Sequence, residues 1–249
     1  MNRRRLLSFF AATPFVGRAN ADPTWTAKFL SGGFDGQIYS AGLYVKMMPD
    51  WKTYWRNPGV AGIPPSITAP TASNLASMEI DFPLPKRISN NGDEAFGYHD
   101  EVLFPLHLKP IDEGFPMSVH FSALFGVCQK VCLPAKLETI LNFTPKSPPS
   151  ADMDLIEQWQ ARVPKQGTIA SAATIEGGVL KLKLMNTYDD IFIEGPEMYY
   201  FRAPDFKSEA GSAFFKIDGL KTDSELKGAN LRITADQAGL GLEQMITVA

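Results

Sequence analysis

The sequence contains two cysteines, Cys128 and Cys132, separated by three residues. On one extended strand these positions would lie about 13 Å apart, too far to bond, whereas across a three-residue hairpin loop they would face each other at the roughly 5.5 Å that suits a disulfide. One helical turn would also bring them together, but Val127, Val131 and Pro134 make a poor helix. We therefore predict a β-hairpin with the cysteines facing each other across its turn.

Several chemistries are open to this pair. A permanent disulfide that closes so short a loop stabilises a fold by only about 2 kcal/mol, against about 5 kcal/mol for a long loop, so we favour a redox-active pair over a structural adaptor with a permanent disulfide. Lys130 within the loop and Lys136 after it would favour the thiolate, the form that attacks a disulfide. Binding of Cu(I) by Cys128 and Cys132, in a copper-binding or copper-tolerance protein, is an alternative.

The first 21 residues have the order of a secretory signal. Arginines at positions 3–5 precede the apolar run Leu6–Val16 and the small residues of Ala19–Ala21, which predicts a cleavable signal peptide over 1–21. Arg3 and Arg4 also fit the loose form of a twin-arginine signal. No later stretch reaches the roughly 20 apolar residues that cross a bilayer. We therefore expect an exported protein, in a compartment where a cysteine pair is oxidised by default.

The charge balance excludes one class of partner. The whole chain has 24 basic and 27 acidic side chains, and removing the four arginines of the predicted signal leaves 20 against 27. A mature chain with a net charge of about −7 lacks the basic surface that nucleic acids require. We expect no nucleic-acid binding.

The mature chain predicts an all-β fold, because short alternating or apolar segments recur between turn residues and the hydrophobic fraction is 45%. We predict two immunoglobulin-like β-sandwich domains, 22–144 and 168–249, joined by a linker at 145–167 with one short helix at Asp152–Val163. The predicted strands are Gln37–Met47, Met78–Phe82, Val102–Leu108, Met117–Phe121, Leu137–Phe143, Thr168–Ala172, Val179–Leu184, Ile191–Glu194, Ser212–Ile217, Asn230–Thr234 and Glu243–Val248.

An aromatic segment follows the first of these predicted strands. Trp51, Tyr54 and Trp55 could form a binding platform, but at these spacings we interpret them as packing residues. The Pro-Gly pair at the end of Arg56–Gly59 predicts a turn.

Several segments together resemble one family. They are Trp51–Gly59, Gly62–Pro65, Phe82–Pro85, Gly97–Tyr98 with Glu101–Pro105, and the cysteine pair followed by Pro134. They resemble the N-terminal periplasmic domain of the protein-disulfide reductase DsbD, in the branch near the copper-tolerance protein ScsB. The resemblance implies a periplasmic, cofactor-free component of a protein-disulfide reductase system, of the kind that serves cytochrome c biogenesis or copper tolerance. Its cysteines would take electrons from a membrane-embedded thiol carrier and pass them to periplasmic thioredoxin-like proteins.

The resemblance also implies a cap over the cysteines. In that family an acidic stretch with an aromatic residue forms a cap loop, and Asp93 and Glu94 lie at the corresponding place with Phe96 and Tyr98. Phe96 is the first cap candidate and Tyr98 the second. The alternative is that both rings fill the sandwich core.

This chain departs from the family pattern in two respects. Three residues separate its cysteines, as in the ScsB-like branch, where the best-known members have five. Full-length relatives continue into a transmembrane carrier and a thioredoxin domain, and neither follows here. We therefore expect a separate membrane protein to supply the electrons.

Overall fold

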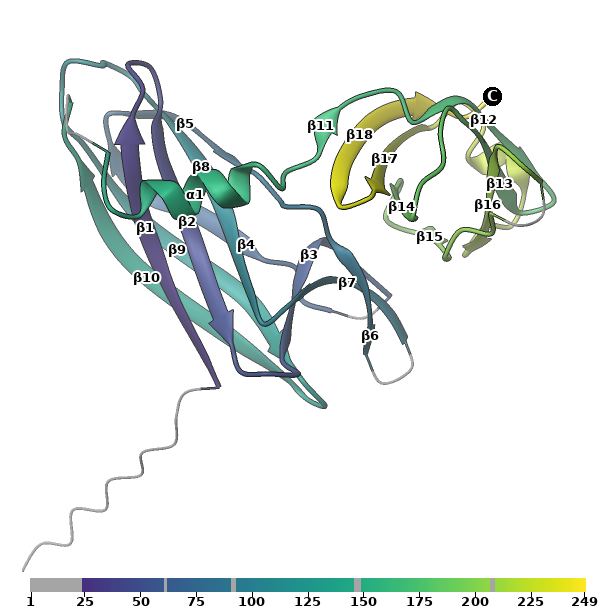
Figure 1. Ribbon diagram of the computed structural model, residues 1–249, viewed down its shortest axis with the longest axis horizontal. Coiled ribbons are helices and arrows are strands. Elements are labelled where there is room, and N and C mark those ends of the chain that lie inside the picture. The colour runs from purple at the N-terminus through teal and green to yellow at the C-terminus, as the bar shows by residue number, and fades with distance from the viewer. Residues whose placement is uncertain (1–23, 61, 91–92, 146–148, 207–208) are drawn as a thin grey trace, which may run out of the picture.

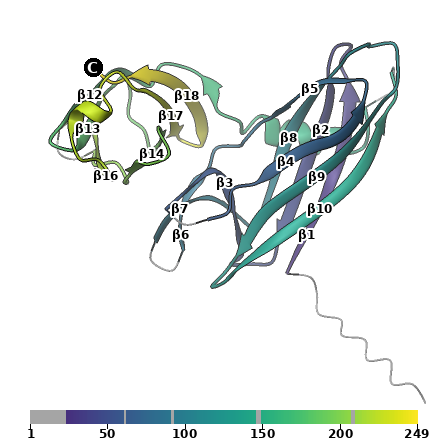
Figure 2. The ribbon, with the colours of Figure 1, turned by 180° about the vertical axis from the view of Figure 1, so that it is seen from behind.

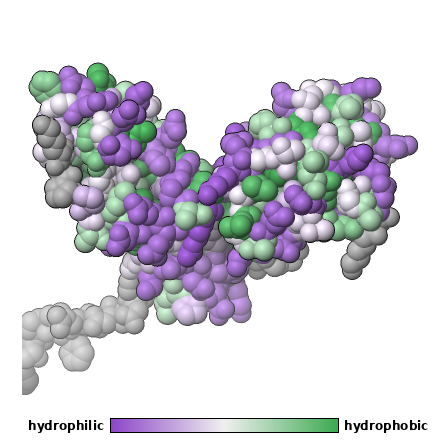
Figure 3. Space-filling model, turned by 45° about the horizontal axis from the view of Figure 1, so that its top comes forward, coloured by the Kyte–Doolittle hydropathy of each residue, from purple (hydrophilic) through white to green (hydrophobic). Residues whose placement is uncertain are grey.

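The computed structural model describes residues 24–249 except 61, 91–92, 146–148 and 207–208. The predicted signal peptide, 1–21, lies outside the described residues. Two groups of strands lie beside each other, an elongated N-terminal group and a smaller C-terminal group (Figure 1; Figure 2, from behind). In the space-filling view they form two lobes with a notch between them (Figure 3).

The N-terminal group is a sandwich of two antiparallel sheets. One sheet has the strand order β1-β2-β8-β5, and the other has the order β10-β9-β3-β7-β6, with β4 pairing onto β9. The strands are β1 (Trp25–Phe34), β2 (Tyr39–Met47), β3 (Lys52–Gly59), β4 (Ser66–Ser73), β5 (Leu75–Ile80), β6 (Lys86–Asn90), β7 (Asp93–His99), β8 (Glu101–Pro110), β9 (Met117–Cys128) and β10 (Cys132–Phe143).

The alternation along β9 explains why this segment forms a strand of the sandwich. Met117, Val119, Phe121, Ala123 and Phe125 are buried, and the residues between them are more exposed. Side chains of a strand point alternately to its two faces, so one face of β9 enters the core. Buried side chains from the opposite sheet, on β2 and β8, complete the same hydrophobic cluster.

The C-terminal group is a second, smaller sandwich with a hydrophobic cluster of its own. Its sheets have the orders β11-β18-β17-β14 and β12-β13-β16-β15, and β11 pairs with β18 in parallel. The strands are β11 (Lys165–Gln166), β12 (Ala170–Glu176), β13 (Val179–Leu184), β14 (Asp190–Glu194), β15 (Tyr200–Phe201), β16 (Ser212–Asp218), β17 (Asn230–Gln237) and β18 (Leu240–Thr247), with a 3₁₀ helix at Asp223–Glu225.

One α-helix, α1 (Met153–Gln160), occurs in the described part of the chain. Its buried residues Ile156 and Trp159 belong to the core of the first sandwich, so the helix packs there and is more than a spacer. It ends before the predicted limit at Val163. None of the helices that the structure describes has the length and apolar character needed to cross a membrane.

The predicted all-β fold with one short helix is confirmed, whereas the predicted turn at Arg56–Gly59 is wrong. Strand β3 continues to Gly59, where the backbone takes a φ of 81° and the pairing register to β7 shifts. The expected cap segment at residues 93–97 is also strand, within β7. The proposed domain limits at 144 and 168 remain a prediction.

Candidate functional site

The two cysteines lie at the turn between β9 and β10, as the spacing predicts. Cys128 ends β9, Cys132 begins β10, and the two are paired directly across the hairpin. A disulfide joins them, with Cα atoms 4.1 Å apart. The hairpin therefore holds both sulfurs at one end of the elongated sandwich.

The two sulfur positions differ in exposure. Cys128 is fully buried, whereas Cys132 is half-buried, and the neighbouring side chains of Val131 and Leu133 are exposed. An incoming thiolate must reach a sulfur along the axis of the bond that it breaks, so the more exposed atom is the accessible target. Of the two cysteines, Cys132 is therefore the more accessible to a thiolate.

Tyr54 of β3 places a polar group beside the half-buried Cys132. Its hydroxyl lies 3.3 Å from Cys132 Sγ. The ring fits between two glycines: a Cβ on Gly62 would come within 2.5 Å of the ring, and a Cβ on Gly126 within 3.3 Å. When the disulfide opens, the hydroxyl can donate to the Cys132 thiolate, which lowers the pKa of that thiol.

Lys52 of β3 lies in register with the two cysteines. It is the Cα partner of Cys128 on β3, so Lys52, Cys128 and Cys132 form one row across three strands. Burial lowers the pKa of the Lys52 ammonium, which is only 6% exposed. Of the lysines that the sequence suggested, Lys136 pairs instead with Glu138 at 2.9 Å, and Lys130 is exposed in the turn.

Ile88 and Ala95, rather than the predicted aromatic residues, pack beside the sulfurs. Together with Tyr54 and Cys128 they form a small buried cluster, against which Cys132 packs. Ile88 and Ala95 face each other across the β6–β7 hairpin. This hairpin thus supplies the apolar cover next to the disulfide.

The cap candidates lie on the opposite face of β7. Phe96 belongs to the main core and contacts Phe192 of the second sandwich edge to face, with ring centroids 5.2 Å apart. Tyr98 donates its hydroxyl to the Pro83 carbonyl at 2.7 Å. Adjacent residues of a strand point to opposite sides, which separates both rings from Ala95 and the sulfurs. Phe96 and Tyr98 thus fill the sandwich core, which was the alternative to a role as cap residues.

The acidic cap candidates are also accounted for. Glu94 forms an ion pair with Arg87 and accepts a hydrogen bond from the Tyr200 hydroxyl at 2.7 Å, so it faces the second sandwich. The side chain of Asp93 lies outside the described part of the structure. Sequence reasoning missed Lys52, Ile88 and Ala95, because only the strand register brings them to the sulfurs.

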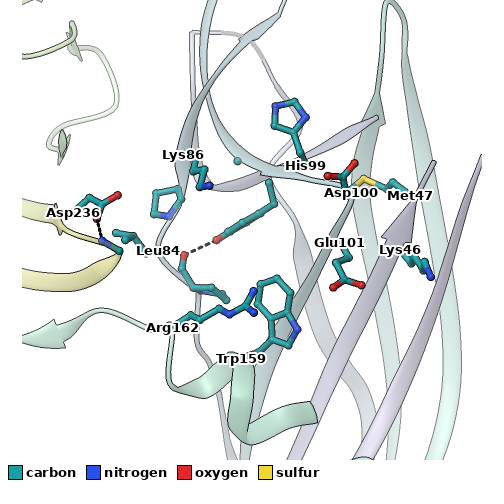
Figure 4. Close-up of a pocket in the computed structure, with 15 residues that line it drawn as sticks. Lys46, Met47, Leu84, Lys86, His99, Asp100, Glu101, Trp159, Arg162 and Asp236 are labelled. Atoms are coloured by element: carbon teal, nitrogen blue, oxygen red, sulfur yellow. Dashed lines mark hydrogen bonds between the residues drawn. The ribbon is translucent and has the colours of Figure 1, made fainter. Parts of the chain in front are cut away.

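A cleft lies elsewhere, between the two sandwiches (Figure 4). It has a volume of about 490 Å³, and Leu84, Trp159, Arg162 and Asp236 are among its lining residues. Neither cysteine lines it. Among the described residues, no group of three or more His, Cys, Asp or Glu side chains is arranged to hold a metal. The Cu(I) alternative at the cysteine pair remains a prediction.

Comparison with known proteins places this site in a family. Residues 23–144 match the model of the family "Thiol:disulfide interchange protein DsbD, N-terminal". The crystal structure of the N-terminal periplasmic domain of ScsB from Proteus mirabilis aligns with a TM-score of 0.73 and 21% identity, covering 91% of this chain and 94% of that one. This similarity establishes the fold over both sandwiches.

Two further comparisons add less. The N-terminal domain of DsbD from Neisseria meningitidis in the reduced form aligns with a TM-score of 0.29 and 11% identity, over 49% of this chain and 91% of that one, which is too low to support structural conclusions. No curated protein sequence gives a significant match. The family match covers the segment that carries the disulfide, and residues 23–144 therefore form a DsbD N-terminal-like domain for thiol-disulfide exchange.

Proposed function

We propose that this protein relays electrons in the periplasm through Cys128 and Cys132. The observation that carries the proposal is the unequal exposure of the two bonded sulfurs at a hairpin turn. A disulfide that serves only to fasten the chain gains little from closing so short a loop. The half-buried Cys132 beside the Tyr54 hydroxyl has the access and the hydrogen bond that exchange chemistry needs.

The reaction begins when a thiolate of the electron donor attacks Cys132 Sγ. The bond between the cysteines breaks, the donor becomes bonded to Cys132, and Cys128 leaves as a thiolate and takes up a proton. The second donor thiol then attacks the mixed disulfide and releases Cys132 as a thiolate, which the Tyr54 hydroxyl stabilises. The donor ends as a disulfide and this protein as a dithiol, a transfer of two electrons.

The second half-reaction reverses these roles. The Cys132 thiolate attacks a disulfide of the acceptor, and Cys128 resolves the mixed disulfide and restores the original bond. Exposed apolar side chains around the turn, on Leu124, Val131 and Leu133, offer a contact surface for a protein partner. We infer that the donor is a membrane-embedded thiol carrier and that the acceptors are periplasmic thioredoxin-like proteins, in keeping with the family match.

Trapping of mixed disulfides tests the relay. The Cys128→Ser variant keeps the accessible Cys132 and lacks the resolving thiol, so it is expected to accumulate covalent complexes in cells. Non-reducing gels and mass spectrometry should then identify a thioredoxin-like protein and a membrane protein. The matched control is Cys132→Ser, whose remaining thiol is buried and should give few complexes.

The same variants separate the alternatives. Absence of reductant-sensitive complexes from both single-cysteine variants would contradict the relay. Full biological activity of the Cys128→Ser, Cys132→Ser double variant would instead support a structural adaptor. Retention of one Cu(I) per reduced protein through gel filtration, with loss in Cys128→Ser, would support copper binding.

A further inference from the structure

The β6–β7 hairpin lies between the disulfide and the second sandwich. Its residues Ile88 and Ala95 pack in the cluster of Cys128. The alternate residues Arg87 and Glu94 form polar contacts with the second sandwich. Because neighbouring residues of a strand point to opposite faces, each strand of this hairpin contacts both regions.

Polar contacts attach the hairpin to the second sandwich. Arg87 Nε donates to Asp190 Oδ1 at 3.0 Å, and Arg87 Nη2 donates to the Ile191 carbonyl at 2.9 Å. The Tyr200 hydroxyl donates to Glu94 Oε2 at 2.7 Å. The side chains of Arg87, Glu94 and Asp190 are each only about a fifth exposed. Charge-assisted hydrogen bonds in such partly buried positions are stronger than those of exposed ion pairs.

Aromatic contacts join the same surfaces. Phe96 contacts Phe192 edge to face at 5.2 Å and stacks on Tyr200 at 6.1 Å. The guanidinium of Arg87 lies 4.9 Å from the Phe96 ring centre and 5.1 Å from that of Phe192. Phe192 is 1% exposed and belongs to the hydrophobic core of the first sandwich, although β14 is a strand of the second. The two sandwiches therefore share part of one core.

Strand β3 is attached to the second sandwich in the same manner. Arg56 donates to both carboxylate oxygens of Glu194, at 2.7 to 3.1 Å, and also pairs with Glu243. Trp55 contacts Phe192 at 5.8 Å, while the preceding residue, Tyr54, reaches Cys132 on the opposite face. Strand β3 and the β6–β7 hairpin are thus attached to the second sandwich by the faces that point away from the sulfurs.

The hairpin needs this support because its own sheet holds it weakly. β6 is the outermost strand of its sheet in the described structure. Regular pairing of β7 with β3 covers His99 to Gly97, and the register then shifts before Ala95. An edge hairpin with interrupted pairing has marginal stability by itself. Its position against the sulfurs therefore depends on contacts made by its two faces.

We propose that the second sandwich is a brace for the disulfide, holding β3 and the β6–β7 hairpin against Cys128 and Cys132 and so limiting the attack of thiolates on the sulfurs. Arg87, Glu94 and Phe96 are then positioning residues that act through the hairpin. Loss of the brace leaves the disulfide in place but lets the hairpin open more often. The proposal concerns the reactivity of the sulfurs and does not depend on which partner exchanges with them.

The test is the rate at which dithiothreitol reduces the oxidised full-length mature protein, followed by trapping of the released thiols with a maleimide. The double variant Asp190→Asn, Tyr200→Phe removes hydrogen-bonding groups of the second sandwich and leaves the first unchanged. We expect its rate constant to rise at least fivefold. Hydrogen exchange of the backbone amides of residues 94–98 should accelerate in parallel.

Two controls separate a brace from general destabilisation. Ile233→Val deletes a buried methyl group in the second sandwich, and Glu209→Gln removes the exposed ion pair with Lys181 in the same sandwich. Ile233 belongs to the separate hydrophobic cluster of the second sandwich and Glu209 pairs with Lys181, so both rates should stay within twofold of wild type. A rise with Ile233→Val equal to that of the double variant would assign the effect to stability alone and overturn the proposal.

Two further variants keep the test decisive. Tyr200→Phe alone removes one hydroxyl and should give a smaller acceleration in a chain that still folds, as circular dichroism would verify. Arg87→Ala removes the anchor from the other side, and its effect should be less than additive with that of Asp190→Asn because both act through one contact. Wild-type reduction rates in the double variant and in Arg87→Ala would overturn the brace, whatever the relay experiments give.

Discussion

The two faces of the layer formed by β3, β7 and β6 carry different kinds of chemistry. The face toward the cysteines has Ile88 and Ala95 beside the sulfurs, the Tyr54 hydroxyl within reach of Cys132, and the buried Lys52 in register with Cys128. The face toward the second sandwich carries two arginines paired with carboxylates and packed over aromatic rings. Because successive side chains of a strand point to opposite faces, the same strands contact the cysteines on one face and the second sandwich on the other.

Because of this arrangement, we expect the disulfide to contribute little to the stability of the molecule. Its loop is closed by the hairpin itself, and β9 and β10 remain paired along their whole length. The junction instead buries Phe192 in the core of the first sandwich. We therefore expect changes on the cysteine face to alter reactivity with little loss of stability. Changes on the junction face should lower stability and, through the brace, also raise the reactivity of the sulfurs.

The largest effect is expected from the cysteines themselves. The double variant Cys128→Ser, Cys132→Ser should lose thiol-disulfide exchange completely, because no sulfur remains to carry electrons. Its free energy of unfolding should fall by no more than about 2 kcal/mol, the entropy contribution of so short a loop. Insulin reduction with a coupled thiol donor measures the first quantity and urea denaturation the second. A much larger loss of stability would identify the disulfide as a structural element.

The next effect tests the opposite face. Phe192→Ala should lower the free energy of unfolding by about 3 to 5 kcal/mol, since it leaves a cavity between the Trp55 and Phe96 rings. Phe214→Ala is the matched control, because that ring is half-exposed and should cost less. Urea denaturation of both variants gives the comparison. Equal losses of unfolding free energy in the two variants would show that Phe192 in the shared core contributes no more to stability than a half-exposed ring.

Tyr54→Phe should change reactivity with little change in stability. A hydrogen bond to a charged group contributes about 1.5 to 3 kcal/mol, and at the low end of that range its loss should raise the pKa of the Cys132 thiol by about one unit. Alkylation by iodoacetamide at pH 6 should slow about threefold, because the lower thiolate fraction is partly offset by greater nucleophilicity. The measurement uses the Cys128→Ser background, which leaves one thiol.

A matched tyrosine distinguishes this effect from the loss of any buried hydroxyl. Tyr188 donates to the Ile169 carbonyl and belongs to the hydrophobic cluster of the second sandwich, which does not include the cysteines. Tyr188→Phe should leave the rate of Cys132 alkylation unchanged. An equal slowing in both variants would remove Tyr54 from the account of sulfur reactivity.

The smallest effect concerns a charge pair that belongs to neither face. Asp81 accepts from His107 at 2.9 Å, and this hydrogen bond raises the pKa of His107 and lowers that of Asp81. The His107 contribution is complete below about pH 6.5 and is lost as the pH rises through the raised pKa; the Asp81 contribution is present above about pH 4 and is lost as the pH falls through the lowered pKa. The pair therefore stabilises most between about pH 4 and 6.5.

Comparison of His107→Gln with wild type by thermal unfolding measures that pair. The variant should lose less than about 1 kcal/mol at pH 5.5, because both side chains are nearly a third exposed, and the loss should shrink at pH 9. A loss that grows with pH would reverse the assigned sign. Such a result would not affect the sulfur chemistry, which lies on another sheet.

The sequence was sufficient to predict the parts of this architecture that depend on local pattern. Spacing placed Cys128 and Cys132 across a hairpin. Alternation predicted strand Met117–Phe121, which is the first part of β9, and strand Val179–Leu184, which is β13. The Pro-Gly pair led to the wrong prediction of a turn at Arg56–Gly59. A bulged strand can contain the same residues as a turn when Gly59 takes a positive φ.

The surroundings of the sulfurs could not be predicted from local pattern. Tyr54 reaches Cys132 across 78 positions of sequence, and Lys52 reaches Cys128 through the register of β3 with β9. Whether Ala95 or Phe96 faces the disulfide depends on a single step of strand register, which reverses every side chain of β7. The resemblance located the right segment, but the structure decided which of its residues approach the cysteines.

The equilibrium reduction potential of the cysteine pair decides whether Cys128 and Cys132 can relay electrons. The purified mature protein would be equilibrated in dithiothreitol and glutathione buffers and its thiols trapped and counted. We predict a value above about −300 mV, in the range where periplasmic partners can open and close the bond. A value well below about −300 mV would mark Cys128–Cys132 as a permanent fastening and contradict the proposed relay.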